Sequence, residues 1–154
     1  MLIRQANLND VPQLVALAHA SPTAAHWTES QYGTALTGYS PRRLVLVLES
    51  DRIDGCVIAA ELGSEWELEN IVVASSHRGR GRGSMLLRAL LEQVVARRGE
   101  RLFLEVRESN SGARALYEKW GFSASGRRRG YYHNPPEDAI LYTKNLAISA
   151  PEIG

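Results

Sequence analysis

Glycine and arginine alternate over six consecutive positions, directly ahead of a long amphipathic segment. Glycines permit backbone conformations that turn successive N–H groups to one side, and such a nest binds anions. The positive end of a following helix and nearby guanidinium groups would strengthen this attraction. The chemistry indicated is the binding of a pyrophosphate by Arg78, Gly79, Arg80, Gly81, Arg82, Gly83 and Ser84.

Two common phosphate motifs do not fit this segment. A Walker loop requires Gly-Lys followed by Ser or Thr, and the dinucleotide fingerprint requires G-x-G-x-x-G, whereas the glycines here stand at 79, 81 and 83. On these residues alone, an RNA-binding arginine-glycine segment and a solvent loop without a ligand remain alternatives. The chain has 18 basic and 17 acidic residues, and this near balance argues against a general nucleic-acid binder.

The segments around this loop predict the elements that would position it. Strands are expected over 2–6, 44–49, 55–62, 66–73, 102–106, 122–126 and 139–144. A helix capped at Asn9 or Asp10 is expected to run to Ala18, and another to open at a capping box that starts at Thr28. Further helices are expected from Ser84 to a cap at Gly99, and over 110–120. The last two strands are expected to be joined by an Arg- and Tyr-rich loop. This order predicts one α/β or α+β domain with a mixed sheet flanked by helices.

Composition narrows the class of protein. The 154 residues are 44% hydrophobic and 23% charged, which suits one packed domain. The lone Cys56 lies in an apolar strand, so we expect a buried, inert thiol, no intrachain disulfide and a reducing cytoplasm. No signal peptide and no apolar run of the ~20 residues that span a bilayer is visible. The four histidines show no metal-ligand spacing, so no metal is expected.

The phosphate-binding segment has a recognisable context. Arg78-x-x-Gly81-x-Gly83, placed after Asn70-Ile71-Val72-Val73 and before an amphipathic helix, resembles the acetyl-CoA motif of the GNAT acetyltransferase superfamily. A second signature of that family is similar to Asn110, Ala115-Leu116-Tyr117-Glu118 and Gly121-Phe122. The likeness covers nearly the whole chain, in order. It implies acetyl-CoA as cosubstrate and a GNAT-like single domain over 1–147, with a mostly antiparallel sheet of about seven strands, about four helices and a frayed tail over 148–154.

Within this superfamily the chain resembles the bacterial ribosomal-protein-alanine N-acetyltransferases. The segments that carry this likeness are 104–107, 109–110, 116–118, 121–122, 128–132 and 137–139. His26-Trp27-Thr28-Glu29 is similar to the substrate loop of that group, in which a proline usually stands at the position of His26. The resemblance implies a ternary complex of the enzyme, acetyl-CoA and a peptide or ribosomal protein. In this complex the N-terminal amine of the peptide or protein attacks acetyl-CoA directly.

The same resemblance implies roles for individual residues. The backbone of Ile71, Val72 and Val73 would hold the acetyl and pantetheine parts of the cofactor, and Asn110 would bond the pantetheine end. Glu105 is the candidate base, and Tyr117 the candidate acid that protonates the departing thiolate. Residue chemistry alone favours a salt bridge from Glu105 to Arg107 or Arg114, and a core position for Tyr117.

The acceptor side of the site is expected to be shaped by Trp27, Tyr131, Tyr132, Glu137 and Asp138. A solvated hairpin, and an interloop core contact for Trp27, are the structural alternatives. Acetylation of a small amine or a lysine side chain, and an acyl-CoA-binding module without turnover, remain alternative functions. We expect a monomer or weak dimer with no nucleic-acid or membrane partner.

Overall fold

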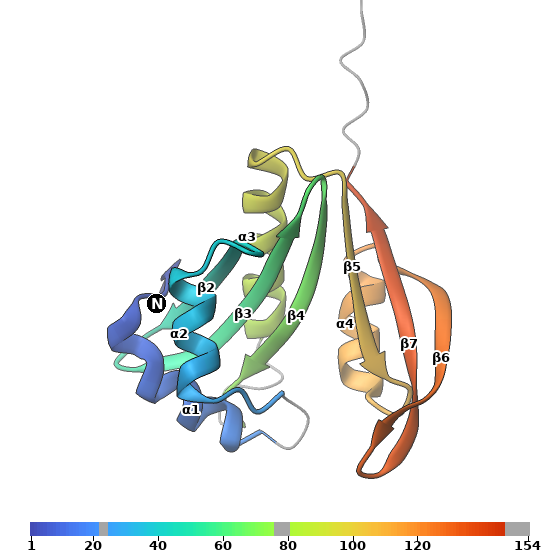
Figure 1. Ribbon diagram of the computed structural model, residues 1–154, viewed down its shortest axis with the longest axis horizontal. Coiled ribbons are helices and arrows are strands. Elements are labelled where there is room, and N and C mark those ends of the chain that lie inside the picture. Colours follow the sequence, from blue (N-terminus) through green and yellow to red (C-terminus); the bar gives the residue numbers. More distant parts are fainter. Residues whose placement is uncertain (22–24, 76–80, 147–154) are drawn as a thin grey trace, which may run out of the picture.

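The computed structural model describes residues 1–21, 25–75 and 81–146, and its elements follow the predicted order (Figure 1). The N-terminal half contains β1 (Leu2–Gln5), a short 3-10 turn η1 (Leu8–Asp10), α1 (Val11–His19), α2 (Glu29–Thr37), β2 (Arg43–Glu49), β3 (Ile53–Leu62) and β4 (Glu65–Val73). The C-terminal half contains α3 (Arg82–Ala96), β5 (Arg101–Arg107), α4 (Ser111–Lys119), β6 (Ser123–His133) and β7 (Pro136–Asn145). The expected tail over 148–154 lies outside the described residues.

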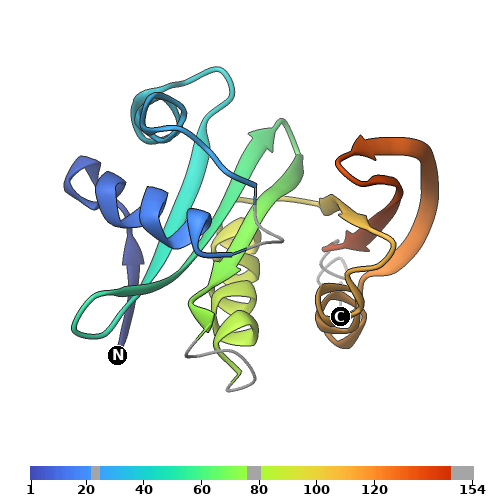
Figure 2. The same cartoon turned by 90° about the horizontal axis from the view of Figure 1, so that it is seen from below.

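One seven-stranded sheet carries the fold, in the order β1-β2-β3-β4-β5-β7-β6. Its strands pair antiparallel except at the β4–β5 contact, which is parallel. Helices α1 and α2 cover one face of the sheet, and α3 and α4 lie on the other (Figures 1 and 2). The predicted mixed, mostly antiparallel sheet with four helices is confirmed.

Strand β2 shows why the central strands have continuous apolar sequences. Every residue from 44 to 48 is buried, because helices cover both faces of the sheet. Leu44, Leu46 and Leu48 pack into the core beneath α3, whereas Val45 and Val47 pack into the core beneath α1 and α2. The alternating directions of β-strand side chains therefore serve two separate cores.

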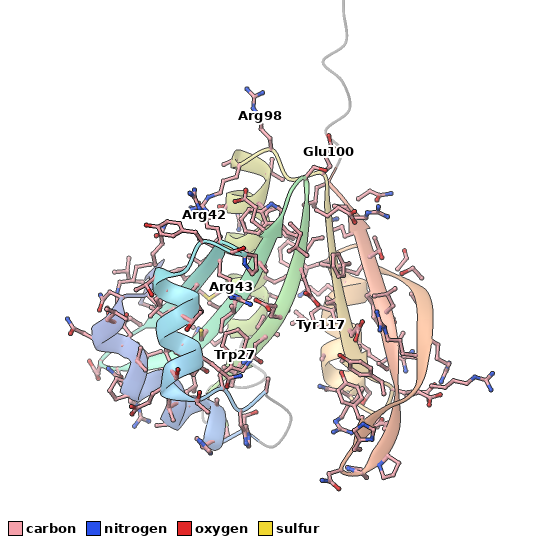
Figure 3. The ribbon with its side chains drawn as sticks, in the orientation of Figure 1. Trp27, Arg42, Arg43, Arg98, Glu100 and Tyr117 are labelled. Carbon is pink, nitrogen blue, oxygen red and sulfur yellow. The ribbon has the colours of Figure 1, made fainter. Side chains whose placement is uncertain are left out.

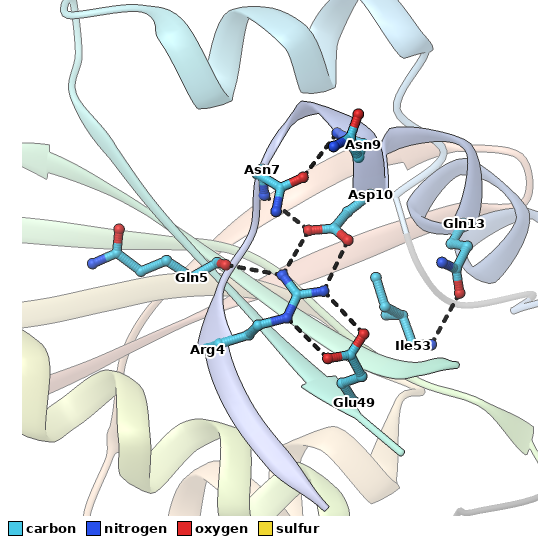
Figure 4. Close-up of polar contacts among 8 residues, drawn as sticks. All are labelled: Arg4, Gln5, Asn7, Asn9, Asp10, Gln13, Glu49 and Ile53. Atoms are coloured by element: carbon cyan, nitrogen blue, oxygen red, sulfur yellow. Dashed lines mark hydrogen bonds and ion pairs between the residues drawn. The ribbon is translucent and has the colours of Figure 1, made fainter. Parts of the chain in front are cut away.

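A polar cluster joins β1, β2 and the start of α1 (Figure 4). The Arg4 guanidinium donates to both carboxylate oxygens of Asp10, at 2.8 and 2.9 Å, and to both of Glu49, at 3.0 and 3.1 Å. Asp10 also accepts the N–H of Asn7 at 2.8 Å, and the Asn7 side chain accepts the N–H of Asn9. Asp10 is the N-cap residue of α1, as one of the two predicted positions, but its side chain makes no cap hydrogen bond to that helix. Asn7 instead caps η1, which runs directly into α1.

The end of α3 also differs from the prediction. The residue in the left-handed conformation is Arg98, with φ of 63°, and not Gly99. A Cβ atom at Gly99 would lie 2.8 Å from Cδ1 of the fully buried Trp66. Gly99 is therefore required by a close approach to the core and does not serve as the helix cap.

The prediction of an Arg- and Tyr-rich loop is wrong, because most of that segment belongs to the long hairpin of β6 and β7. Strand β6 runs to His133 and β7 starts at Pro136. Nearly all of β6 is exposed, so no apolar alternation reveals it in the sequence. Its pairing is interrupted by a bulge, in which residues 129–131 stand opposite the single residue Asp138.

Candidate active site

Strands β4 and β5 diverge and open a cleft at the centre of the sheet. Their parallel pairing covers only three positions, from Glu65–Arg101 to Glu67–Phe103, although both strands continue further (Figure 1). Directly after this point, β4 carries a bulge at Glu69, because Ala59 pairs with Leu68 and Ile58 with Asn70. A bulge bends its strand, which turns β4 away from β5. The resulting cleft has a volume of about 860 Å³.

The expected cofactor-binding residues line this cleft wherever the structure describes them. They are Ile71, Val72, Val73, Gly81, Arg82, Gly83, Ser84 and Asn110. Arg78, Gly79 and Arg80 lie outside the described residues. The structure thus brings the end of β4, the start of α3 and the start of α4 around one cavity.

The start of α3 fits a phosphate ligand. Gly81 holds φ of +75°, a conformation that glycine adopts readily and that lets the chain turn into the helix. The N–H of Met85 bonds the carbonyl of Gly81, so the N–H groups of residues 82–84 precede the helical ladder. These groups and the positive helix end favour an anion in the cleft.

Close contacts join α4 to the start of α3. The Trp120 indole N–H donates to the Ser84 hydroxyl at 3.1 Å, and a Cβ atom at Gly83 would lie 3.3 Å from Leu116. Asn110 caps α4 by accepting the N–H of Ala113 at 3.2 Å. The start of α3 therefore packs against the C-terminal half of α4, and both line the cleft.

Tyr117 belongs both to the core and to the cleft. It is only 4% exposed, and its ring lies 5.7 Å from that of Phe122 and 6.2 Å from that of Tyr142, measured between centroids. It also lines the cleft. Burial raises the pKa of the Tyr117 hydroxyl well above its usual range, so the group stays protonated at neutral pH. A proton donor at the cleft is the chemistry this permits.

Glu105 lies on β5 where the cleft opens, and its ion-pair partner is Arg128 of β6. Arg128 Nε lies 2.8 Å from Glu105 Oε1. Neither partner considered from the sequence is used: Arg107 pairs with Glu137, and Arg114 donates to the Glu108 carbonyl. The base candidate therefore faces the cleft while it is held by the outer strand of the sheet.

Two further carboxylates accompany Glu105, and the sequence reading missed both. Glu67 is partly buried, and its pKa is raised by burial and by the charges of Glu69 and Glu105. Glu69 lines the cleft and accepts the Arg43 guanidinium at 2.6 Å. The available signal was the alternation Glu65-Trp66-Glu67-Leu68, which places acidic residues on one face of β4 and apolar ones on the other.

Only one of the residues expected on the acceptor side lines the cleft. Tyr132 lines the cleft, with the Arg107 guanidinium 4.2 Å from its ring centroid. Trp27 packs on Tyr32, beneath the Arg43 guanidinium, and does not line the cleft. Figure 3 places Trp27 on the α2 side and Tyr117 on the α4 side of the gap between β4 and β5.

The remaining three acceptor-side residues are engaged within the hairpin and its neighbours. Tyr131 is 47% exposed and stands edge-on against Tyr132. Glu137 accepts the N–H of Ser109 and pairs with Arg107. Asp138 accepts the N–H of Gly130 at 2.9 Å and pairs with Arg127. None of the three lines the cleft beside Tyr117, although Tyr131 lies against Glu105, whose charge raises the pKa of the Tyr131 hydroxyl.

The described residues, 1–21, 25–75 and 81–146, carry few other candidate functional features. No group of three or more His, Cys, Asp or Glu side chains within that part of the chain could hold a metal ion. None of the helices described combines the length and apolar character needed to cross a membrane. Cys56 is buried as expected, and burial raises the pKa of its thiol to about 12.

Known proteins resemble this chain in sequence and in fold. The model of the acetyltransferase (GNAT) family matches residues 11–122. The ribosomal protein bS18-alanine N-acetyltransferase of Salmonella typhimurium is 38% identical over 139 residues, covering 88% of this chain and 89% of that protein. The enzyme of the same name from Haemophilus influenzae is 38% identical over 121 residues, covering 76% and 82%.

A solved structure has a similar fold. The crystal structure of the ribosomal-protein-S18-alanine N-acetyltransferase from Escherichia coli has a TM-score of 0.85 and 27% identity, and the match covers 99% of this chain and 98% of that one. These findings confirm the acetyl-CoA-dependent acetyltransferase class that the sequence predicts. The chain belongs to the GNAT family of acetyltransferases.

Proposed function

We propose that this protein acetylates the N-terminal amine of a ribosomal protein that begins with alanine. The observation that carries this proposal is the single cleft in which the start of α3, the end of β4, Glu105 and Tyr117 meet. The names of the similar proteins supply the acceptor class. A ribosomal acceptor also implies a cytoplasmic enzyme.

The reaction requires a neutral amine, because an ammonium group has no lone pair. An N-terminal amine has a pKa near ~8, against ~10.4 for lysine, so it loses its proton more easily at neutral pH. Glu105 accepts that proton, directly or through a water molecule. Glu67 and Glu69 add negative charge that attracts the incoming ammonium to the same face of the sheet.

Acetyl-CoA supplies the thioester carbon to which the amine nitrogen bonds as the carbon–sulfur bond breaks. A backbone N–H of Ile71, Val72 or Val73 polarises the carbonyl. Tyr117 donates its proton to the leaving sulfur, which its raised pKa permits because the hydroxyl is protonated beforehand. Asn110 and the start of α3 hold the pantetheine and pyrophosphate parts.

The test is a thiol-release assay with acetyl-CoA and three acceptors: a peptide that begins with alanine, the same peptide already acetylated at its N-terminus, and a polyamine. Turnover of the free peptide alone is expected. Turnover of the polyamine but not the peptide would assign the enzyme to small amines, and coenzyme A binding without thiol release would make it a binding module.

Two variants test the residue roles. Glu105→Gln and Tyr117→Phe should each lower kcat by about 10²-fold or more, the range that acid–base groups contribute, without weakening coenzyme A binding. Tyr39→Phe is the matched control, because Tyr39 is 82% exposed and lies away from the cleft. Unchanged rates in both Glu105→Gln and Tyr117→Phe would remove these assignments.

A further inference from the structure

The ion pair between Glu105 and Arg128 joins a partly buried carboxylate to an exposed cation. The Glu105 side chain is 15% exposed and the Arg128 side chain 62%. The Arg128 guanidinium also lies 5.6 Å from the ring centroid of Tyr131, which is itself half exposed. Within the described part of the chain, Arg128 has no other carboxylate within 4 Å. Its release therefore requires no rearrangement of the core.

The bulge of β6 sets the position of Arg128. Arg128 pairs with Ala139 at the last regular position before the bulge, and pairing resumes at Tyr132. Asp138 fills the space opposite the bulge, where its carboxylate accepts the N–H of Gly130 at 2.9 Å and pairs with Arg127 at 2.8 Å. Gly130 adopts φ of +60°, which glycine accommodates readily. The bend is thus fixed by specific contacts, although the strand lies at the edge of the sheet.

The charges around Glu105 show which cation can leave. Glu67 and Glu69 face it from β4, and two cations, Arg43 and Arg128, neutralise part of this negative charge. Arg43 is held by two hydrogen bonds to Glu69, at 2.6 and 3.2 Å, with its side chain 19% exposed. Tyr131 and Tyr132 face Glu105 from β6. The charge of Glu105 raises the pKa of Tyr131, whereas burial and then the charge of Glu105 raise the pKa of Tyr132. Arg128 is the exposed cation of this set, held by one ion-pair contact.

We propose that Arg128 occupies, in the free enzyme, the place on Glu105 that the ammonium group of the acceptor takes on binding. This inference rests on the proposed function, in which Glu105 receives the acceptor amine. Arg128 is then a positioning residue. It holds the Glu105 carboxylate in place at the cleft, and the acceptor must displace it. Its strength as a competitor sets the apparent affinity for the acceptor.

The test compares steady-state kinetics of the wild type, Arg128→Ala, Arg128→Lys and Arg129→Ala with a peptide that begins with alanine. Without its competitor, Arg128→Ala should have a KM for the peptide about 2- to 5-fold lower, which corresponds to the strength of an exposed ion pair. Its KM for acetyl-CoA should stay unchanged. Arg128→Lys keeps the cation and should return the peptide KM to near the wild-type value. Arg129 is the matched control, an exposed neighbour in the bulge without an ion pair in the described residues.

The outcomes separate this inference from the proposed function. A wild-type enzyme that releases no thiol with any alanine peptide refutes the proposed function itself. If the wild type turns over but the peptide KM of Arg128→Ala rises or stays the same, only the exchange at Glu105 is refuted. A fall in KM that Arg129→Ala shares, or that Arg128→Lys does not reverse, also overturns it, because the effect would then not depend on the cation at position 128.

Discussion

Asp10→Asn should destabilise the protein far more than an ordinary loss of surface charge. Asp10 is 5% exposed and accepts two hydrogen bonds from Arg4 and one from the N–H of Asn7. An asparagine keeps the shape but replaces one acceptor oxygen by an NH₂ group, which would face a donor. The substitution therefore breaks the bidentate pair that joins β1 to the start of α1.

The size of the loss follows from these contacts. Removing one member of a buried ion pair costs about 3–5 kcal/mol when the other charge is left alone. Arg4 keeps its second partner, since both oxygens of Glu49 accept from it. We therefore expect a smaller loss, about 2–3 kcal/mol of the free energy of unfolding, in the range for hydrogen bonds to charged groups.

The pH dependence gives a second, independent signature. The hydrogen bonds from Arg4 hold the pKa of Asp10 below its ordinary range. A carboxylate with a lowered folded-state pKa contributes its full stabilisation above its unfolded pKa, near ~3.9, and loses it as the pH falls through the folded value. The difference between wild type and Asp10→Asn should therefore be constant from pH 5 to 7 and shrink below about pH 4.

Urea denaturation followed by tryptophan fluorescence measures both effects, since the chain has three tryptophans. Glu92→Gln is the control, because Glu92 pairs with Arg88 across one helical turn with both side chains largely exposed. It should cost no more than about 0.5 kcal/mol. The reasoning fails if Asp10→Asn is as mild as this control at pH 7, or if its effect is undiminished at pH 3.

Two glycine substitutions separate binding from stability. Gly81→Ala places a side chain at φ of +75° with no atom of the described residues within 4 Å, so it should cost only about 1–2 kcal/mol of stability but weaken coenzyme A binding in calorimetry. Unaltered affinity would show that this turn does not hold the cofactor. Gly99→Ala places its Cβ atom 2.8 Å from Trp66 and should cost about 1–3 kcal/mol with coenzyme A affinity retained. If the midpoint of thermal unfolding of Gly99→Ala equals that of the wild type, the close approach at Gly99 is contradicted.

Local signals in the sequence were sufficient for most elements. The capping box of Thr28 and Gln31 forms as predicted, because its hydrogen bonds span only three residues. Gly121 ends α4 at φ of +87° for the same local reason. The exposed strand β6 gave such a signal only over 122–126. Beyond that its side chains are exposed, and its bulge depends on contacts with β7.

The candidate site also combines features predicted from the sequence with contacts that only the tertiary structure sets. Residue type and spacing in the sequence predicted a pyrophosphate-binding segment, and the resemblance to a known family predicted Glu105 as base and Tyr117 as acid. Only the tertiary structure decided that Glu105 pairs with Arg128, that Glu67 and Glu69 join it, and that Asp138 supports the hairpin. These contacts depend on strand order, register and two bulges, which arise when segments distant in sequence pair and which no local pattern specifies.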